Sequence, residues 1–93
     1  MTTIWKFVLK PGRSSVEMPA GAKLLTVQMQ DGEPTLWALV VQGGPMVTRI
    51  IDTYGTGHPL PANPGYYLAT VQMHGGSLIW HVFDATHAAK EQP

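Results

Sequence analysis

Short segments rich in β-branched and aromatic residues follow one another along the chain, and clusters of glycine and proline separate them. Within several segments apolar side chains recur at every second position, which is the period of a β-strand. The pattern predicts seven strands, at residues 3–10, 14–18, 23–30, 35–42, 46–54, 66–74 and 77–83. We therefore expect one all-β domain over residues 1–84, followed by a flexible or weakly helical tail at residues 85–93.

One four-residue sequence, TVQM, occurs twice, at residues 26–29 and 70–73. Each copy is followed by a glycine-containing turn and a strand centred on tryptophan, Trp37 in the first copy and Trp80 in the second. The copies are 44 residues apart before the turn and 43 after it, so we expect the first turn to be one residue longer. The repeat predicts two related β-hairpins. We expect them to build a small antiparallel sandwich or barrel of about seven strands.

The tryptophan strands are apolar on both faces. In the first strand Trp5 and Phe7 share one face, while Ile4 and Val8 share the other. An antiparallel sheet in a small domain normally exposes one face to water, so apolar residues on both faces indicate that another subunit covers the outer one. The composition agrees, because 44% of the 93 residues are hydrophobic and only 13% are charged, about half the usual fraction. The sequence predicts a homo-oligomer.

Charge and cysteine content argue against several classes of protein. Six basic residues balance six acidic ones, and no cluster of lysine or arginine offers the basic face that nucleic acids require. The chain has no cysteine, hence no disulfide, thiolate metal site or cysteine nucleophile. No apolar run approaches the length of a membrane helix, and the N-terminus lacks the pattern of a signal peptide. We expect a soluble intracellular protein that contacts neither nucleic acid nor membrane.

The longest predicted connection, YGTGHPLPANPG at residues 54–65, holds three glycines and three prolines. Glycine allows positive φ and lets backbone N–H groups approach an anion, while proline stiffens the remainder. Long connections in small domains are often functional, so Gly55, Thr56, Gly57 and His58 are candidates for holding a small ligand. The alternative is a connection that needs glycine and proline only to turn corners. A phosphate-binding P-loop does not fit, since no Lys-Ser/Thr pair follows.

Other side chains extend this candidate site. Tyr54 and Tyr66 border the loop and are suited to stacking on a planar ring, as is Tyr67. Arg49 is suited to clamping a phosphate or carboxylate, and His74 to hydrogen bonding. The four histidines are spaced too widely to favour a metal site, and no cofactor is expected. The predicted ligand-binding residues are Arg49, Tyr54, Gly55, Thr56, Gly57, His58, Tyr66 and His74.

Catalysis is less well supported. The serines lack a nucleophile elbow and a recognisable base. A hydrolase would have to use His58 as base, Asp52 to orient it and Thr56 to position the substrate. We therefore expect a protein that binds without catalysis.

Four segments, at residues 4–7, 36–40, 54–59 and 73–83, resemble a family of short phage and prophage proteins described as a domain of unknown function. YGTGHP and MHGG…WHVF are the most specific parts. The resemblance brings no catalytic residues, and it implies an accessory protein in the cytoplasm of an infected bacterium. Small phage proteins of this size include sponges that sequester nucleotide-derived immune signals, and we expect this function. The alternatives are a phage structural or interaction protein without a small ligand, and a His-dependent phosphodiester or glycosidic hydrolase.

Overall fold

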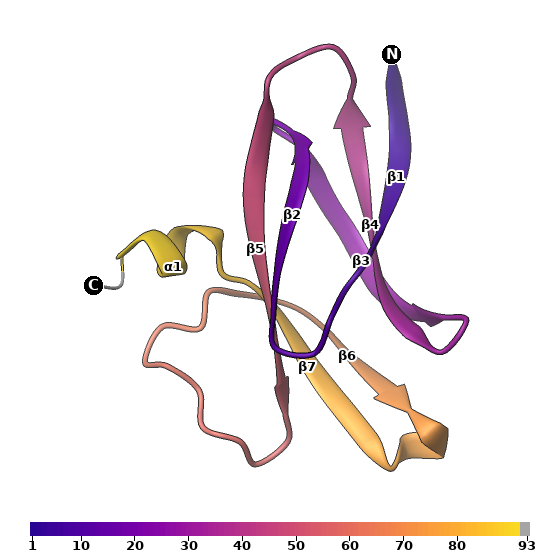
Figure 1. The fold of residues 1–93 in the computed structure, drawn as a ribbon, viewed down its shortest axis with the longest axis vertical. Helices are drawn as coiled ribbons and strands as arrows, with labels where there is room; N and C mark the ends of the chain where they lie inside the picture. The colour runs from indigo at the N-terminus through magenta and orange to yellow at the C-terminus, as the bar shows by residue number, and fades with distance from the viewer. Residues whose placement is uncertain (92–93) are drawn as a thin grey trace.

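The computed structural model describes residues 1–91 and contains the seven predicted strands, each within two residues of its expected ends. The elements are shown in Figure 1: β1 (Thr2–Val8), β2 (Arg13–Pro19), β3 (Lys23–Gln30), β4 (Glu33–Val41), β5 (Met46–Gly55), β6 (Tyr66–Met73), β7 (Leu78–Asp84) and α1 (Thr86–Glu91), with a 3₁₀-turn at His74–Gly76. The helix lies in the predicted tail, where Ala85 and Ala88 are buried. Residues 92–93 of that tail lie outside the described residues. Among residues 1–91, no helix has the length and apolarity needed to cross a membrane.

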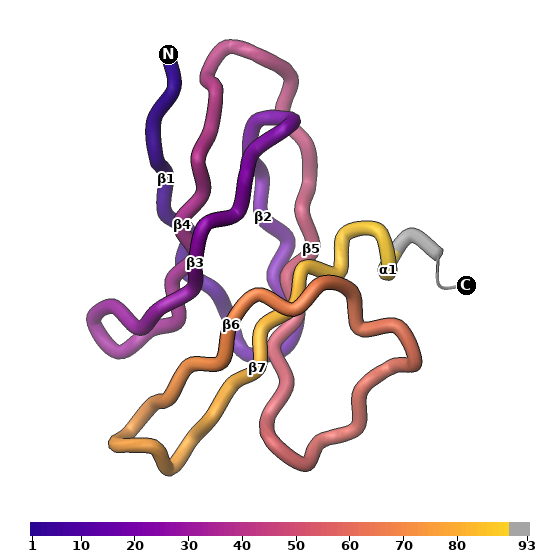
Figure 2. Tube along the Cα trace, turned by 180° about the vertical axis from the view of Figure 1, so that it is seen from behind, coloured from indigo at the N-terminus to yellow at the C-terminus, as the bar shows by residue number. Residues whose placement is uncertain are grey.

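The strands form two antiparallel sheets and no closed barrel. One sheet has the order β1-β4-β3, and the other has the order β2-β5-β7-β6. The chain crosses between them after β1, β2 and β4, so the first half alternates between sheets while the second half, from β5 on, stays in one (Figures 1 and 2). The expected all-β fold is confirmed, and two open sheets replace the alternative of a barrel.

The core lies between the sheets and is built by the period-two pattern. From β4, alternate residues Leu36, Ala38 and Val40 are all fully buried. The opposing sheet contributes apolar side chains from each of its strands, including Met18, Ile51 and Val82. On β1, Trp5 and Phe7 pack against this core, whereas Ile4 is 54% exposed on the other face. The outer face of the three-stranded sheet therefore carries exposed apolar side chains, with Lys6 among them.

The two predicted hairpins are confirmed as β3–β4 and β6–β7, and they share one backbone register. Val27 pairs with Leu36, and adding 44 to both numbers gives the observed pair Val71 and Trp80. The expectation of a longer first turn is wrong. The first hairpin turns through two residues, Asp31 and Gly32, which both have positive φ as a two-residue hairpin loop requires. The second turns through the four residues 74–77, of which His74, Gly75 and Gly76 have positive φ.

The second copy of the repeat has one residue fewer before its tryptophan, and this moves the tryptophan by one position along the strand relative to the backbone pairing. Trp80 occupies the inward position that Leu36 fills in the first hairpin, whereas Trp37 pairs with Thr26 on the outer face. A shift of one residue reverses the face on which a strand side chain lies. The second hairpin thus places an indole between the sheets where the first places a leucine.

Candidate functional site

The long loop leaves the four-stranded sheet at Gly55, which is the last residue of β5 to pair with β7, opposite Trp80. Strand β7 begins at Leu78, so its first residues have no partner on that side. The space between the loop and the β6–β7 hairpin is a hollow of about 200 Å³. Its lining consists of Gly55, Thr56, His58, Ser77, Leu78, Ile79 and Trp80.

A tight turn fixes the position of His58 in this hollow. The backbone N–H of His58 donates to the carbonyl of Gly55 at 3.1 Å, and Gly57 adopts a φ of 83°. The imidazole folds back over Gly55, so closely that a Cβ added to Gly55 would lie only 2.9 Å from Cε1 of His58. The two glycines therefore contribute in different ways. Gly57 adopts the positive φ of the turn, and Gly55, which has no side chain, leaves room for the imidazole ring.

A chain of hydrogen bonds connects the loop to the outer face of the sheet. Thr56 Oγ1 lies 2.7 Å from Nε2 of His81, and Thr70 Oγ1 lies 3.0 Å from Nδ1 of the same ring. Tyr67 continues the chain with its hydroxyl 2.6 Å from Thr70 Oγ1. Both nitrogens of His81 are thus engaged by hydroxyl groups, which holds the ring in one orientation and ties the start of the loop to β7.

Three aromatic rings lie beside this chain on the same outer face. Phe83 packs edge-on against Tyr54 at a centroid distance of 5.9 Å and against Tyr67 at 5.7 Å. Tyr67 is 59% exposed, so part of this aromatic surface faces water. Together these rings form a partly open apolar surface next to the hydroxyl groups.

The carboxylate of Asp52 adjoins the rings and is held by a neighbouring strand. Arg13 donates to both of its oxygens, from Nε at 2.8 Å and from Nη2 at 2.9 Å, and the Tyr54 hydroxyl lies 3.4 Å away. The hydrogen bond to Asp52 raises the pKa of Arg13. Burial, together with the nearby negative charge, raises the pKa of Tyr54. These contacts place Asp52 with Arg13 rather than in the pairing with His58 that a hydrolase would use.

Three predicted ligand residues lie elsewhere. Arg49 points between the sheets, where Nη2 contacts Asp84 at 2.6 Å and Nη1 donates to the carbonyl of Ala22 at 3.2 Å. Tyr66 lines a different hollow at the other end of the loop, and His74 is an exposed turn residue with a φ of 51°. Of the predicted set, the structure brings together Gly55, Thr56, Gly57 and His58, with Tyr54 one strand position away.

The prediction omitted five residues that build the hollow or support it, namely Ser77, Leu78, Ile79, Trp80 and His81. Their places depend on where β5 ends relative to β7 and on which face each β7 residue occupies. The sequence did contain one signal, the one-residue difference between the repeats, which changes the face of Trp80. No lysine or arginine lines the hollow, and among residues 1–89, whose side chains are described, there is no group of three or more acidic or histidine side chains able to hold a metal.

Comparison with known proteins places the whole chain in one family. No curated protein and no solved structure matches the sequence. The model of a family described as Domain of unknown function (DUF7352) matches residues 1–93, which confirms the expected membership of an uncharacterised domain family. The chain belongs to the DUF7352 family.

Proposed function

We propose that the hollow beside the long loop binds a small anionic, nucleotide-derived molecule and holds it without chemical change. The observation that carries the proposal is the position of His58, which Gly55 and Gly57 fix within a hollow that Thr56 and Ser77 also line. Small-molecule sites are typically concave, mostly apolar and equipped with a few convergent polar groups. Leu78, Ile79 and Trp80 supply the apolar wall.

The charge of the hollow determines how an anion would be held. With no lysine or arginine in the lining, the hydrogen bonds would come from the Thr56 hydroxyl, the His58 imidazole and backbone N–H groups, because the Ser77 hydroxyl already donates to the carbonyl of His74. Successive backbone N–H groups in a turn with one positive-φ residue can form a concave anion site, and Gly57 supplies the positive φ. The N–H of His58 already donates to the carbonyl of Gly55, so the N–H groups that precede it in the turn would have to bind the anion. Neutral donors select a ligand by shape and hydrogen bonding more than by net charge.

The size of the hollow indicates which part of the ligand it holds. A cavity of about 150 Å³ accepts a benzene ring, so 200 Å³ holds one ring or one phosphate group rather than a whole dinucleotide. The remainder would lie on the outer sheet face, where Tyr67 and Phe83 offer rings for stacking. Thr56 joins the two regions through its contact with His81.

The arrangement of Asp52 favours binding over hydrolysis. A general base needs a group that orients it, and the carboxylate closest in sequence to the loop is held by Arg13. In the phage context that the sequence suggests, retention without turnover would remove a host immune signal from the cytoplasm of the infected cell.

A calorimetric screen tests the proposal with cyclic dinucleotides, cyclic ADP-ribose isomers and mononucleotides as probes. His58→Asn is expected to weaken the binding of any hit at least about tenfold. His74→Asn is the matched control, because His74 lies outside the hollow and asparagine tolerates its positive φ. Mass spectrometry of ligand released by denaturation is expected to return it unchanged. The absence of any hit, or equal effects of both variants, overturns the site, and recovered product overturns the non-enzymatic assignment.

A second candidate function is self-association or structural interaction through the outer face of the three-stranded sheet. Ile4, Leu39 and Val41 lie together on it by register, and Val41 is 60% exposed. This apolar face supports the proposed homo-oligomer, in which a second copy covers it. Light scattering after size exclusion is expected to give a multimer that Val41→Lys dissociates. Leu60→Lys, on the long loop, is the control and should leave the mass unchanged. A monomeric parent protein refutes this candidate.

A further inference from the structure

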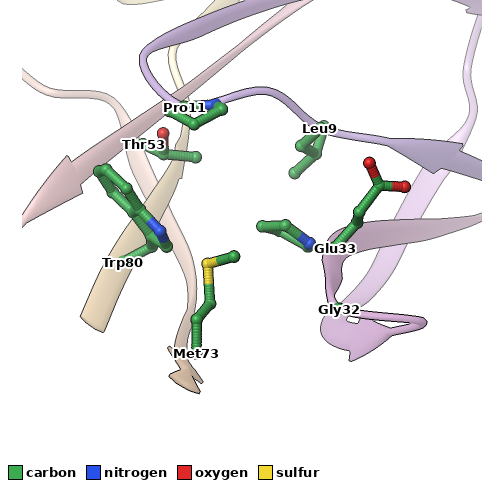
Figure 3. A pocket seen from close by; sticks show the side chains of 8 residues that line it. Leu9, Pro11, Gly32, Glu33, Thr53, Met73 and Trp80 are labelled. Carbon is green, nitrogen blue, oxygen red and sulfur yellow. The ribbon is translucent and has the colours of Figure 1, made fainter. Parts of the chain in front are cut away.

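A second cavity lies between the two sheets, at the end where the β3–β4 turn approaches the start of β2. Its volume is about 210 Å³. The lining residues come from both sheets and are Leu9, Pro11, Gly32, Glu33, Pro34, Thr53, Met73 and Trp80 (Figure 3). It shares Trp80 with the loop hollow but contains none of the loop residues.

The indole N–H of Trp80 is the one buried side-chain polar atom among the described residues that has no hydrogen-bonding partner. Figure 3 shows this nitrogen on the edge of the ring nearer to Met73. Buried polar groups are almost always paired, and an unpaired donor lowers stability. Because an indole nitrogen only donates, the group that would satisfy it is an acceptor.

The other polar groups of the cavity are not free donors. Thr53 Oγ1 accepts from the backbone N–H of Gly12 at 2.8 Å and lies 3.2 Å from the carbonyl of the same residue. Glu33 is exposed and lies on the opposite side of the cavity from Trp80 (Figure 3). Its carboxylate disfavours an anion, so the cavity combines apolar walls, a negative charge at the rim and, within the wall that Trp80 forms, one buried donor without a partner.

We propose that this cavity binds a small neutral aromatic molecule whose carbonyl oxygen accepts the hydrogen bond of the Trp80 indole. The volume exceeds the roughly 150 Å³ that accepts benzene, so a single ring with a short substituent fits. The thioether of Met73 favours an aromatic ring, and the two prolines are rigid apolar surfaces. This site is independent of the proposed function of the loop.

Titration followed by ¹H–¹⁵N spectra of the indole groups tests the inference with three probes. Acetophenone carries the ring and the carbonyl, α-methylstyrene has the same shape without the acceptor, and benzoate is anionic. Acetophenone is expected to shift the Trp80 indole signal downfield and to bind at least about tenfold more tightly than α-methylstyrene, which corresponds to about 1.4 kcal/mol. Benzoate should not bind. No indole shift, or equal affinities of the two neutral probes, overturns the proposal.

Two variants separate this cavity from the loop hollow. Met73→Phe fills the cavity but keeps Trp80, and it is expected to abolish acetophenone binding without lowering the melting temperature. His58→Asn alters only the loop hollow and should leave acetophenone binding unchanged. Trp80→Phe identifies the indole signal among the three tryptophans. Acetophenone affinity that survives Met73→Phe but falls in His58→Asn would assign the probe to the loop and refute the inference.

Discussion

The ion pair between Arg49 and Asp84 provides the sharpest test of the structure, because the sequence suggested a ligand clamp at Arg49. The two side chains are only 19% and 10% exposed, so both charges are largely removed from water. Asp84 accepts one hydrogen bond from Arg49 and two from Thr86, from its backbone N–H at 3.1 Å and its hydroxyl at 2.6 Å. Thr86 in turn accepts from the N–H of Ile50, so the pair links β5, β7 and the C-terminal helix.

Arg49→Met keeps most of the aliphatic length but removes the charge. Breaking a buried ion pair costs about 3–5 kcal/mol, and the lower end applies because Asp84 keeps its contacts with Thr86. For a domain of this size each kcal/mol lowers the melting temperature by about 4–8 °C, so a loss of about 3 kcal/mol lowers it by about 12–24 °C. Thermal unfolding followed by circular dichroism at pH 7 measures this. A decrease below 3 °C would refute the structural role.

The pH dependence gives an independent check. Burial alone would raise the pKa of Asp84, but the hydrogen bonds from Thr86 and Arg49 outweigh it and hold the pKa below its ordinary value of 3.8. A lowered carboxyl pKa stabilises the fold above the ordinary value and loses this contribution as the pH falls through the lowered one. The variant lacks the contact with Arg49 that lowers this pKa, so Asp84 takes up a proton at a higher pH in Arg49→Met than in the parent. The difference in stability between the parent and Arg49→Met should therefore be fully present at pH 7 and shrink as the pH falls into the range where Asp84 of the variant is protonated.

Three further substitutions test local geometry. Gly65→Ala places a Cβ 2.2 Å from the backbone oxygen of Asp84, at a φ of 97°, and should lower the free energy of unfolding in urea by at least about 3 kcal/mol. The control Gly44→Ala places its Cβ in open space and should change the free energy of unfolding by less than about 0.5 kcal/mol. Equal effects of the two substitutions would contradict the close approach at Gly65. Gly55→Ala should displace the His58 ring, seen as a shift of its Cε1–H signal, with little change in melting temperature. Thr53→Val removes the hydroxyl that holds the β1–β2 turn and should cost about 1–3 kcal/mol in urea unfolding; an unchanged midpoint would show that the hydroxyl is not needed.

The strands were predictable because the glycine and proline clusters coincide with the actual turns. Asp31–Gly32 and Gly75–Gly76 adopt positive φ values where the chain reverses, and the intervening segments alternate in burial as the period-two pattern requires. The long loop and the turn residues Gly55, Gly57 and His58 were also visible, since such a run of glycine and proline is uncommon inside regular structure. Local chemistry determined these features, so local sequence revealed them.

The partners of charged and aromatic side chains were not predictable in the same way. The assignment of Arg49 to a ligand took no account of Asp84, which lies 35 residues away in sequence and meets it only through the β5–β7 pairing. The same holds for His81, whose hydrogen bonds reach Thr56 in the loop after β5 and Thr70 on β6. Strand order and register create these contacts, and neither is encoded in the residues of one segment.

The second hairpin carries both candidate sites because two deviations from the first hairpin coincide there. The second repeat has one residue fewer, so Trp80 points inward at the position that corresponds to Leu36. A leucine packs well among apolar neighbours, but the indole N–H is a hydrogen-bond donor that such neighbours leave without a partner. The early departure of β5 at Gly55 then leaves the start of β7 without a partner on the same side. Trp80 pairs with Gly55 at that point, so one ring borders the loop hollow and the cavity between the sheets. The first hairpin, with a fully buried Leu36 at the equivalent position, contributes to the core instead.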